Sequence, residues 1–209
     1  MIKAILYDLD NTLYPVPAIG EKLFAPVFKA IEESGKHANN IADIKREMMR
    51  TPFRLVAKKY GMSDALTEKC IKIQETLTYD EPIPTFDDYR EILKLSADRY
   101  LVTTGFFKMQ QSKVDAMGIR NDFKEIHIVD PTQSSKKKVF SDILSRNGYK
   151  ASEALVVGDD PESEIKAAKE LGIATVLYDR EKTWPAGTAD YQIQSFMEMA
   201  AIVSNIPKT

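Results

Sequence analysis

Four short polar segments of the 209-residue chain carry side chains that could together act on a phosphate ester. The first places the carboxylates of Asp8 and Asp10 two positions apart, directly after the apolar run of residues 2–7. A carboxylate can attack as a nucleophile, transfer protons or bind a hard cation. Taken alone, the pair is equally consistent with solvated loop acids or a helix N-cap, because Asp and Asn are common in both places.

Two further segments supply groups that suit the oxygens of a phosphoryl group. Thr103 and Thr104 end an apolar run and precede a glycine, so they offer hydroxyl donors and an open backbone. Three consecutive lysines begin a predicted helix, where positive charge can lie beside a phosphate. Lys136 is predicted for this role because it lies nearest the helix start. Lys137 is the alternative, and at least one of the three lysines is expected to be solvated.

The fourth segment adds acids after another apolar run. Asp159 and Asp160 follow Gly158, and together with Asp8 and Asp10 they would repel one another unless a cation lay among them. Carboxylate oxygens are hard ligands, which favour Mg²⁺ over softer metals. The segment therefore predicts a magnesium site, provided that the fold brings these segments together.

Apolar runs of strand length alternate with segments of helical periodicity over most of the chain. The predicted strands are residues 2–7, 100–103, 125–129, 154–157, 173–177 and 191–193. The predicted helices are residues 88–95, 108–117, 136–147, 161–171 and 195–203. This alternation is typical of an α/β fold, here a Rossmann-like parallel sheet with helices on both faces. Ligands of such sheets bind at the carboxyl ends of the strands, where we expect the polar segments to meet.

A helical insertion is predicted between the first strand and the rest of the sheet. Residues 18–78 show helical periodicity without a strand-like run, and we expect three or four helices packed as a small bundle. The chain is thus predicted to divide into an α/β core domain, residues 1–15 and 83–209, and a helical cap domain, residues 16–82. Because the insertion leaves from the carboxyl edge of the first strand, it could roof the site, and the proline pairs that flank it mark plausible hinges.

The four polar segments, in this order, resemble the four motifs of the haloacid dehalogenase-like hydrolase superfamily. The matching segments are Asp8-x-Asp10-x-Thr12, Leu101-Val102-Thr103, the lysine that begins the helix 136–147, and Gly158-Asp159-x-x-x-x-Glu164-Ile165. The likeness extends over the whole chain except the insertion, which is similar to a C1-type cap in place and size only. Where the family commonly has Asp, this chain has Glu164, one methylene longer. We therefore expect Glu164 to hold the lysine or a metal-bound water rather than the metal.

The resemblance implies covalent hydrolysis of a phosphomonoester. Asp8 would attack phosphorus and form an aspartyl-phosphate. Asp10 would protonate the leaving alcohol and then take a proton from the attacking water. Mg²⁺ is the implied cofactor, held by Asp8, by the backbone carbonyl of Asp10 and by Asp159.

The resemblance also implies a set of phosphate ligands, namely Thr103, the backbone amide of Thr104, and Lys136. Thr103 and Lys136 are accordingly counted with the two aspartates as catalytic. The expected partner is a small phosphorylated metabolite such as a nucleotide or a sugar phosphate. Residues 8–15 resemble nucleotidase-like members of the family, including pyrimidine 5′-nucleotidases, and this is the only support for a nucleotide.

Several alternatives stay open at the level of sequence. Asp10 counts against halide release, because a departing halide needs no acid, and no Lys-Thr-Gly follows the nucleophile as it does in cation-pumping ATPases. Phosphatase is therefore the first expectation and sugar-phosphate mutase the second. A mutase needs polar groups from the cap, where His37 is expected to be a solvated loop residue. A binding protein that kept the fold without turnover is the third.

Composition limits the remaining classes. The formal net charge of −2 argues against a nucleic-acid binder, because phosphate backbones are held by basic surfaces. No stretch approaches the roughly 18 apolar residues of a membrane span. The single cysteine, Cys70, excludes an intramolecular disulfide and is expected to be buried in a helix. The expected location is the cytoplasm, and the expected assembly is a monomer or a homodimer.

Overall fold

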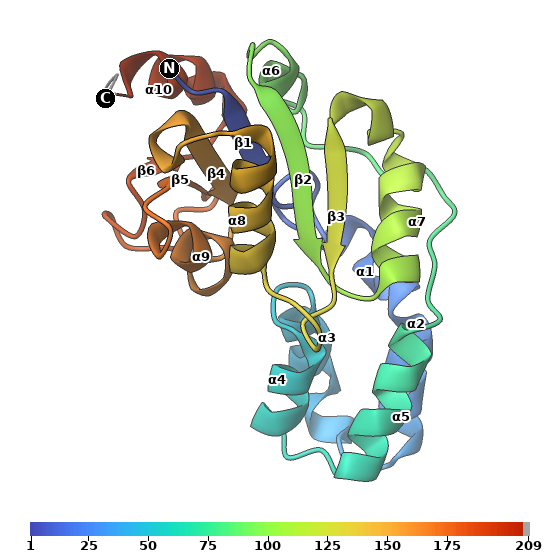
Figure 1. The fold of residues 1–209 in the computed structure, drawn as a ribbon. Coiled ribbons are helices and arrows are strands. Elements are labelled where there is room, and N and C mark those ends of the chain that lie inside the picture. Colours follow the sequence, from blue (N-terminus) through green and yellow to red (C-terminus); the bar gives the residue numbers. More distant parts are fainter. Residues whose placement is uncertain (207–209) are drawn as a thin grey trace. The chain divides into compact units, whose positions relative to one another are not determined.

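The structure is a computed structural model that describes residues 1–206. Within these residues, six strands form one sheet in the order β3-β2-β1-β4-β5-β6 (Figure 1). The strands are β1 (Ala4–Tyr7), β2 (Asp98–Thr104), β3 (Glu125–Val129), β4 (Ala154–Gly158), β5 (Ala174–Tyr178) and β6 (Tyr191–Ile193). Every adjacent pair is parallel, so the predicted α/β class with a parallel sheet is confirmed.

The central strand, β1, sets the position of the polar segments. Its four apolar residues are all buried, as expected of a strand with neighbours on both sides and helices on both faces. The register pairs Tyr7 with Leu101 of β2 and with Val157 of β4. Because the three strands run in the same direction, the residues that follow them emerge at one edge of the sheet. The backbone N–H of Asp8 still donates to the carbonyl of Val157, at 3.0 Å.

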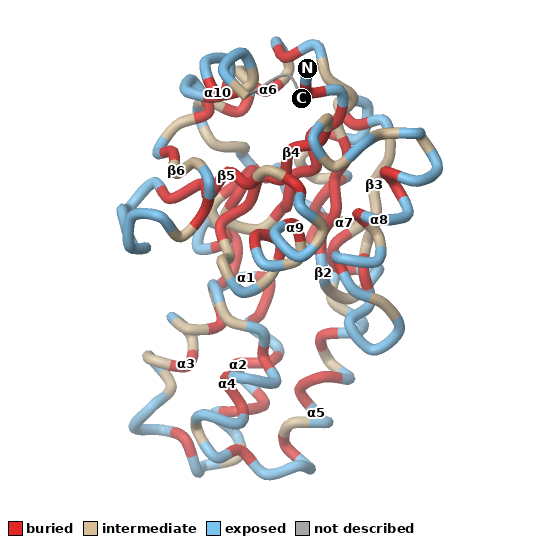
Figure 2. Tube along the Cα trace, turned by 60° about the vertical axis from the view of Figure 1, so that its left-hand side comes forward, coloured by how far each residue is buried: buried red, intermediate tan, exposed pale blue. Residues whose placement is uncertain are grey.

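Helices cover both faces of the sheet; its inner strands β2, β1, β4 and β5 are largely buried, whereas the edge strands β3 and β6 are mostly half-buried (Figure 2). On one face, α8 (Lys136–Asn147) and α9 (Lys166–Lys169) contribute to a buried cluster with alternate strand residues. The members of this cluster include Leu6, Tyr100, Val102, Phe140, Ile143, Val156 and Ala168. Side chains alternate along a strand, so Tyr7 faces the other way. There its ring contacts those of Phe123 and Phe196, and Phe196 belongs to η5 (Phe196–Glu198), the turn before α10 (Met199–Asn205).

Three predicted helices are shorter in the structure, and the one predicted over residues 195–203 is divided into the turn η5 and the helix α10. The helix predicted over residues 88–95 is only α6 (Arg90–Leu93). The helix predicted over residues 161–171 begins instead with the π-helical turn η4 (Pro161–Ile165), and α9 follows it. Pro161 lies at the start of this turn, where a missing N–H costs no helical bond, and the backbone N–H of Asp160 donates to the carboxylate of Glu164. Such π-turns are frequent at functional sites.

The described residues divide into two compact units, one of residues 1–14, 84–105 and 118–206, the other of residues 15–83 and 106–117. The helices of the second unit are α1 (Pro17–Leu23), α2 (Ala25–Glu33), η1 (Ala38–Asn40), α3 (Ile41–Met48), α4 (Phe53–Lys59), α5 (Asp64–Gln74) and α7 (Phe107–Met117). The insertion thus has five α-helices and not three or four. Pro26 cannot donate to a preceding turn, so the apolar residues Leu23, Val27, Ala30 and Ile31, whose helical spacing favours a single helix, are divided between α1 and α2.

Residues 106–117, which the sequence analysis places in the core domain, group with the second unit. The backbone N–H of Tyr79 donates to the Ser112 hydroxyl at 2.8 Å, and that of Ile83 to the carbonyl of Ala116 at 3.2 Å. These bonds join the end of the insertion to α7. The predicted domain bounds, 1–15 with 83–209 and 16–82, stay a prediction, because compactness alone does not test which segments fold independently.

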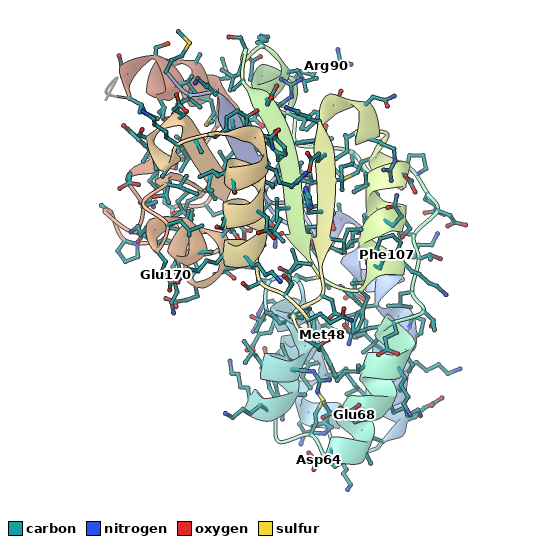
Figure 3. The ribbon with its side chains drawn as sticks, viewed as in Figure 1. Met48, Asp64, Glu68, Arg90, Phe107 and Glu170 are labelled. Carbon is teal, nitrogen blue, oxygen red and sulfur yellow. The ribbon has the colours of Figure 1, made fainter. Side chains whose placement is uncertain are left out.

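For two residues of the second unit, Cys70 and His37, the degree of burial was predicted from the sequence. Cys70 is buried in α5, as predicted, and α5 carries Asp64 and Glu68 one turn apart (Figure 3). His37 is 7% exposed, so its prediction as a solvated loop residue is wrong. A histidine ring has an apolar body that gains from burial even when it begins a short turn. No helix of residues 1–206 is both long and apolar enough for a membrane span.

Candidate active site

Three buried acids and one lysine meet at the carboxyl ends of β1 and β4. Asp8 directly follows β1, Asp159 directly follows β4, and Glu164 comes from the π-turn. One carboxylate oxygen from each of these acids lies within 4.8 Å of the other two. The acids are 7%, 8% and 1% exposed, respectively. Buried charges of one sign need a compensating cation, and Lys136 is the first such group.

Lys136 bridges two of the acids. As the first residue of α8, it extends its ammonium to Asp8 Oδ1 at 2.6 Å and to Glu164 Oε2 at 2.7 Å. Ser135 fixes the start of that helix, since its hydroxyl accepts the backbone N–H of Lys138. Lys137, one position on, pairs at the surface with Glu170, the residue labelled beyond α9 in Figure 3. Of the two lysines considered from the sequence, Lys136 is the one that reaches the acid cluster.

The charges of this cluster are not balanced by the lysine alone. Burial raises the pKa of Asp8 to about 7; the ammonium of Lys136 opposes this shift, and the charge of Glu164 adds to it. Burial also disfavours the charged form of Lys136, but the two carboxylates outweigh it and hold the lysine's pKa well above its ordinary value. The lysine is therefore a fixed cation, and the acids retain an excess of negative charge that a second cation could offset.

Gly158 provides the space that Glu164 occupies. A Cβ at position 158 would lie 2.1 Å from Glu164 Oε1 and 2.3 Å from its Cγ. The side chain of Glu164 therefore folds across bare backbone, where its Oε1 accepts the N–H of Asp160 at 2.8 Å. Both carboxylate oxygens of Glu164 thus accept a bond, one from the backbone and one from Lys136.

We expect Gly158→Ala to destabilise the protein by about 1–3 kcal/mol, the usual cost of forcing an extra methyl into a packed site. The measurement is urea unfolding of the single variant, of Glu164→Ala and of the double variant. If Glu164 is the obstacle, Gly158→Ala costs much less once Glu164 is truncated. An equal cost in both backgrounds would show that the methyl meets something else.

Asp10 lies in a tight turn after β1. Asn11 adopts a left-handed φ of 56°, and the N–H groups of Thr12 and Leu13 donate to the carbonyl of Leu9. This turn brings the hydroxyl of Tyr14 to Asp10, where it donates to Oδ1. The pKa of Tyr14 lies well above that of an ordinary phenol, mainly because of burial and also because of the neighbouring Asp10 charge. Tyr14 is therefore a protonated donor, and no motif or spacing in the sequence points to it.

The two predicted phosphate-binding threonines end the neighbouring strand. Thr103 is 1% exposed and Thr104 is exposed. Since Leu101 is level with Tyr7, both threonines lie beyond the level of β1's last residue, at the same edge of the sheet as Asp8. The backbone N–H of Gly105 donates across to Val129, which holds this end of β2 against β3. The structure places both threonines at the predicted edge, and their roles stay predictions.

The donor set of the cluster fits a magnesium ion. Asp8 and Asp159 offer oxygen ligands only, which is the type that Mg²⁺ prefers. Glu164 already accepts bonds on both oxygens, so it is better placed to hold Lys136 than to replace a ligand. This arrangement agrees with the expectation that Glu164 holds the lysine.

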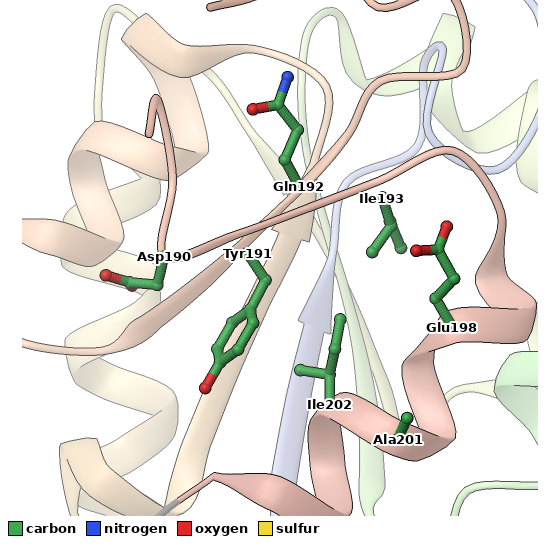
Figure 4. Close-up of a pocket in the computed structure, with 7 residues that line it drawn as sticks. All are labelled: Asp190, Tyr191, Gln192, Ile193, Glu198, Ala201 and Ile202. Carbon is green, nitrogen blue, oxygen red and sulfur yellow. The ribbon is translucent and has the colours of Figure 1, made fainter. Parts of the chain in front are cut away.

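A surface hollow of about 490 Å³ lies beside β6 and α10 in the same unit (Figure 4). The residues that line it are Asp190, Tyr191, Gln192, Ile193, Glu198, Ala201 and Ile202. No predicted site residue is among them. The Asp190 carboxylate accepts both the N–H and the hydroxyl of Thr175, at 2.8 Å and 2.7 Å, and so serves to anchor the end of the sheet.

Comparison with known proteins agrees with this geometry. The sequence model of a family described as haloacid dehalogenase-like hydrolase matches residues 5–178. The chain is 27% identical to a glyceraldehyde 3-phosphate phosphatase from Methanopyrus kandleri, with all of both chains covered. It is 26% identical to a ribulose-1,5-bisphosphate 5-phosphatase from Halopiger xanaduensis, covering 98% of this chain and 100% of that protein.

A solved structure shows the same fold. A haloacid dehalogenase-like family hydrolase from Streptococcus pneumoniae superposes with a TM-score of 0.74 at 21% identity. The match covers 96% of this chain and 98% of the other. The similarity therefore extends over both compact units and is not confined to the sheet.

Proposed function

The chain belongs to the haloacid dehalogenase-like hydrolase family, and from that premise we propose that it is a magnesium-dependent phosphatase that forms an aspartyl-phosphate on Asp8. The observation that carries this proposal is the buried contact of Lys136 with both Asp8 and Glu164, beside Asp159. The named activities of the relatives support small phosphorylated sugars as the substrate class. An excess of buried carboxylate charge supports a divalent cation.

The proposed first step transfers the phosphoryl group to the protein. An oxygen of Asp8 forms a bond to phosphorus while the bond from phosphorus to the ester oxygen breaks, and Asp10 gives its proton to the departing alcohol. In the second step Asp10 takes a proton from water, the water oxygen bonds to phosphorus, and the bond to Asp8 breaks. The products are the alcohol, inorganic phosphate and the regenerated pair of aspartates.

Lys136 has two tasks in this scheme. Its bond to Asp8 Oδ1 orients the nucleophile before substrate arrives, and its charge attracts the phosphoryl oxygens. Glu164 keeps the ammonium in place during both steps, since its carboxylate is itself held by the N–H of Asp160. Thr103 and the backbone amide of Thr104 would donate to the remaining phosphoryl oxygens.

Asp8, the backbone carbonyl of Asp10 and Asp159 would hold Mg²⁺. When bound, the ion would neutralise part of the phosphoryl charge that otherwise repels a carboxylate nucleophile. Asp159 is buried directly after β4, so it can serve as a ligand without turning away from the sheet edge.

The test is phosphate release by the purified protein from glyceraldehyde 3-phosphate, ribulose 1,5-bisphosphate, a set of nucleotides and an aryl phosphate, with and without Mg²⁺. We expect magnesium-dependent release that is fastest from the sugar phosphates. If only nucleotides turn over, the substrate class is wrong. If no substrate releases phosphate, the phosphatase proposal is wrong; a product of changed phosphate position would then indicate a mutase.

The raised pKa of Asp8 predicts how magnesium affinity depends on pH. A protonated Asp8 cannot serve as a full ligand, so binding must release its proton. The apparent affinity should therefore rise about tenfold per pH unit from about pH 5 to about pH 7, where Asp8 titrates, and level off above that range. Isothermal titration calorimetry with Mg²⁺ alone measures this. The control is Asp8→Asn, which should bind more weakly and with a much flatter dependence; a flat wild-type profile would contradict the prediction.

A further inference from the structure

We propose that Tyr14 is a positioning residue for Asp10, holding the carboxylate in the orientation that protonates the leaving alcohol. This inference rests on the proposed function, because it assigns a part to Tyr14 within the same site. The contact that carries it is the hydrogen bond from the Tyr14 hydroxyl to Asp10 Oδ1.

Tyr14 is held in place in two ways, through the backbone of the residue before it and through the burial of its own ring. The N–H of Leu13, the preceding residue, donates to the carbonyl of Leu9 at 2.9 Å, and its carbonyl accepts the N–H of Phe86 at 2.9 Å. The Tyr14 side chain is 0% exposed, so its ring is enclosed on all sides. A tyrosine has only two side-chain torsions, and packing fixes both. The hydroxyl is thus a donor at a set position relative to the end of β1.

The orientation of the Asp10 carboxylate matters directly to the proposed first step. Asp8 is buried and anchored by Lys136, whereas Asp10 is only partly buried in a turn that includes the left-handed Asn11. A general acid must face the departing oxygen within hydrogen-bond reach, and rotation of its carboxylate would lose that alignment. The bond on Oδ1 restrains this rotation. If the bond were only structural, so that Asp10 merely accepted the hydrogen bond of a buried hydroxyl, the effect of removing that hydroxyl on activity would not depend on the leaving group.

Substrates with different leaving groups distinguish a positioning role of Tyr14 from a purely structural one. A sugar phosphate releases a poor alkoxide that needs the proton of Asp10, whereas an aryl phosphate such as 4-nitrophenyl phosphate releases a stable phenolate that does not. We expect Tyr14→Phe to lower kcat/KM for the sugar phosphate about 10- to 100-fold and for the aryl phosphate less than about 3-fold. Because kcat/KM reports steps up to the first irreversible one, it isolates transfer to Asp8.

The matched control is Tyr89→Phe. Tyr89 is also buried, and its hydroxyl also donates to a carboxylate, that of Asp122 at 2.8 Å, but this pair is not part of the proposed site. The control should leave both values of kcat/KM unchanged. Urea unfolding of each variant shows whether it is folded, and the double variant Tyr14→Phe/Asp10→Asn provides a second test. If Tyr14 acts through Asp10, its loss has no further effect on the sugar phosphate once Asp10 is replaced.

Three results would overturn the proposal: an equal loss on both substrates, no loss on either, or an undiminished effect of Tyr14→Phe in the Asp10→Asn background. If the wild type is active and Asp10→Asn shows the selective loss while Tyr14→Phe does not, the proposed function stands and the role of Tyr14 is wrong. A wild type inert on both substrates overturns the proposed function itself and the role of Tyr14 with it.

Discussion

Asp8→Asn is expected to abolish phosphate release and to leave the fold intact. The amide has nearly the shape of the carboxylate but cannot attack phosphorus, so turnover should fall by about ten-thousandfold or more, as for other replaced nucleophiles. Lys136 keeps its bond to Glu164 at 2.7 Å. The change also removes one negative charge from a cluster in which acids outnumber the lysine. The temperature of unfolding should therefore be equal to or above that of the wild type.

The measurement is release of phosphate with Mg²⁺ from the best substrate of the panel, with a thermal melt of each protein. Asp142→Asn, on the exposed side of α8, is the matched control for an acid-to-amide change and should behave as wild type. Wild-type-like turnover in Asp8→Asn would show that another group attacks phosphorus.

Lys136→Met has the second largest expected effect, and it should reduce both activity and stability. Methionine fills a similar volume without charge, so two buried carboxylates would lose the cation that they share. Breaking a buried ion pair by removing one partner typically costs about 3–5 kcal/mol. Loss of a charged group beside the phosphoryl oxygens should lower kcat about 10²- to 10³-fold. Part of the stability should return as the pH is lowered, because burial raises the pKa of Asp8 and the variant lacks the ammonium that opposes this shift, so Asp8 can take a proton.

Lys137→Met is the control for this prediction. Lys137 begins the same helix one residue later, but its ammonium pairs with the exposed Glu170. Its replacement should change neither unfolding nor turnover measurably, as is usual for surface ion pairs. Urea unfolding and phosphate release for both variants test the assignment. Equal effects at positions 136 and 137, or a larger effect at 137, would contradict it.

The sheet and its order of elements could be predicted from the sequence because buried parallel strands have short apolar runs with clear ends. The structure confirms the α/β class, and the match to residues 5–178 confirms the predicted family. The predicted number of helices in the insertion was too low because Pro26 divides an apolar pattern, from Leu23 to Ile31, whose helical spacing looks continuous. The π-turn before α9 could not be predicted either, since apolar periodicity does not reveal the contact of Glu164 with the backbone of Asp160 that accompanies it.

The residues of the candidate site could also be predicted only in part from the sequence. Asp8 and Asp159 directly follow apolar strands, so their common edge could be inferred, but adjacent lysines cannot be told apart by composition. Successive residues of a helix point about 100° apart, so that Lys136 faces Asp8 while Lys137 faces Glu170. Tyr14 was missed because its contact with Asp10 arises in an irregular turn, where no periodicity pairs residues four apart.

The most direct test of the central claim is chemical trapping of the covalent intermediate. Enzyme, Mg²⁺ and the best substrate are mixed, quenched rapidly and treated with borohydride, which reduces an acyl phosphate to an alcohol but leaves a free carboxylate intact. Peptide mass spectrometry then locates the change. We expect homoserine at position 8 in the wild type only when substrate is present. Phosphate release with an unmodified Asp8, or with the alcohol at another acid, would contradict it.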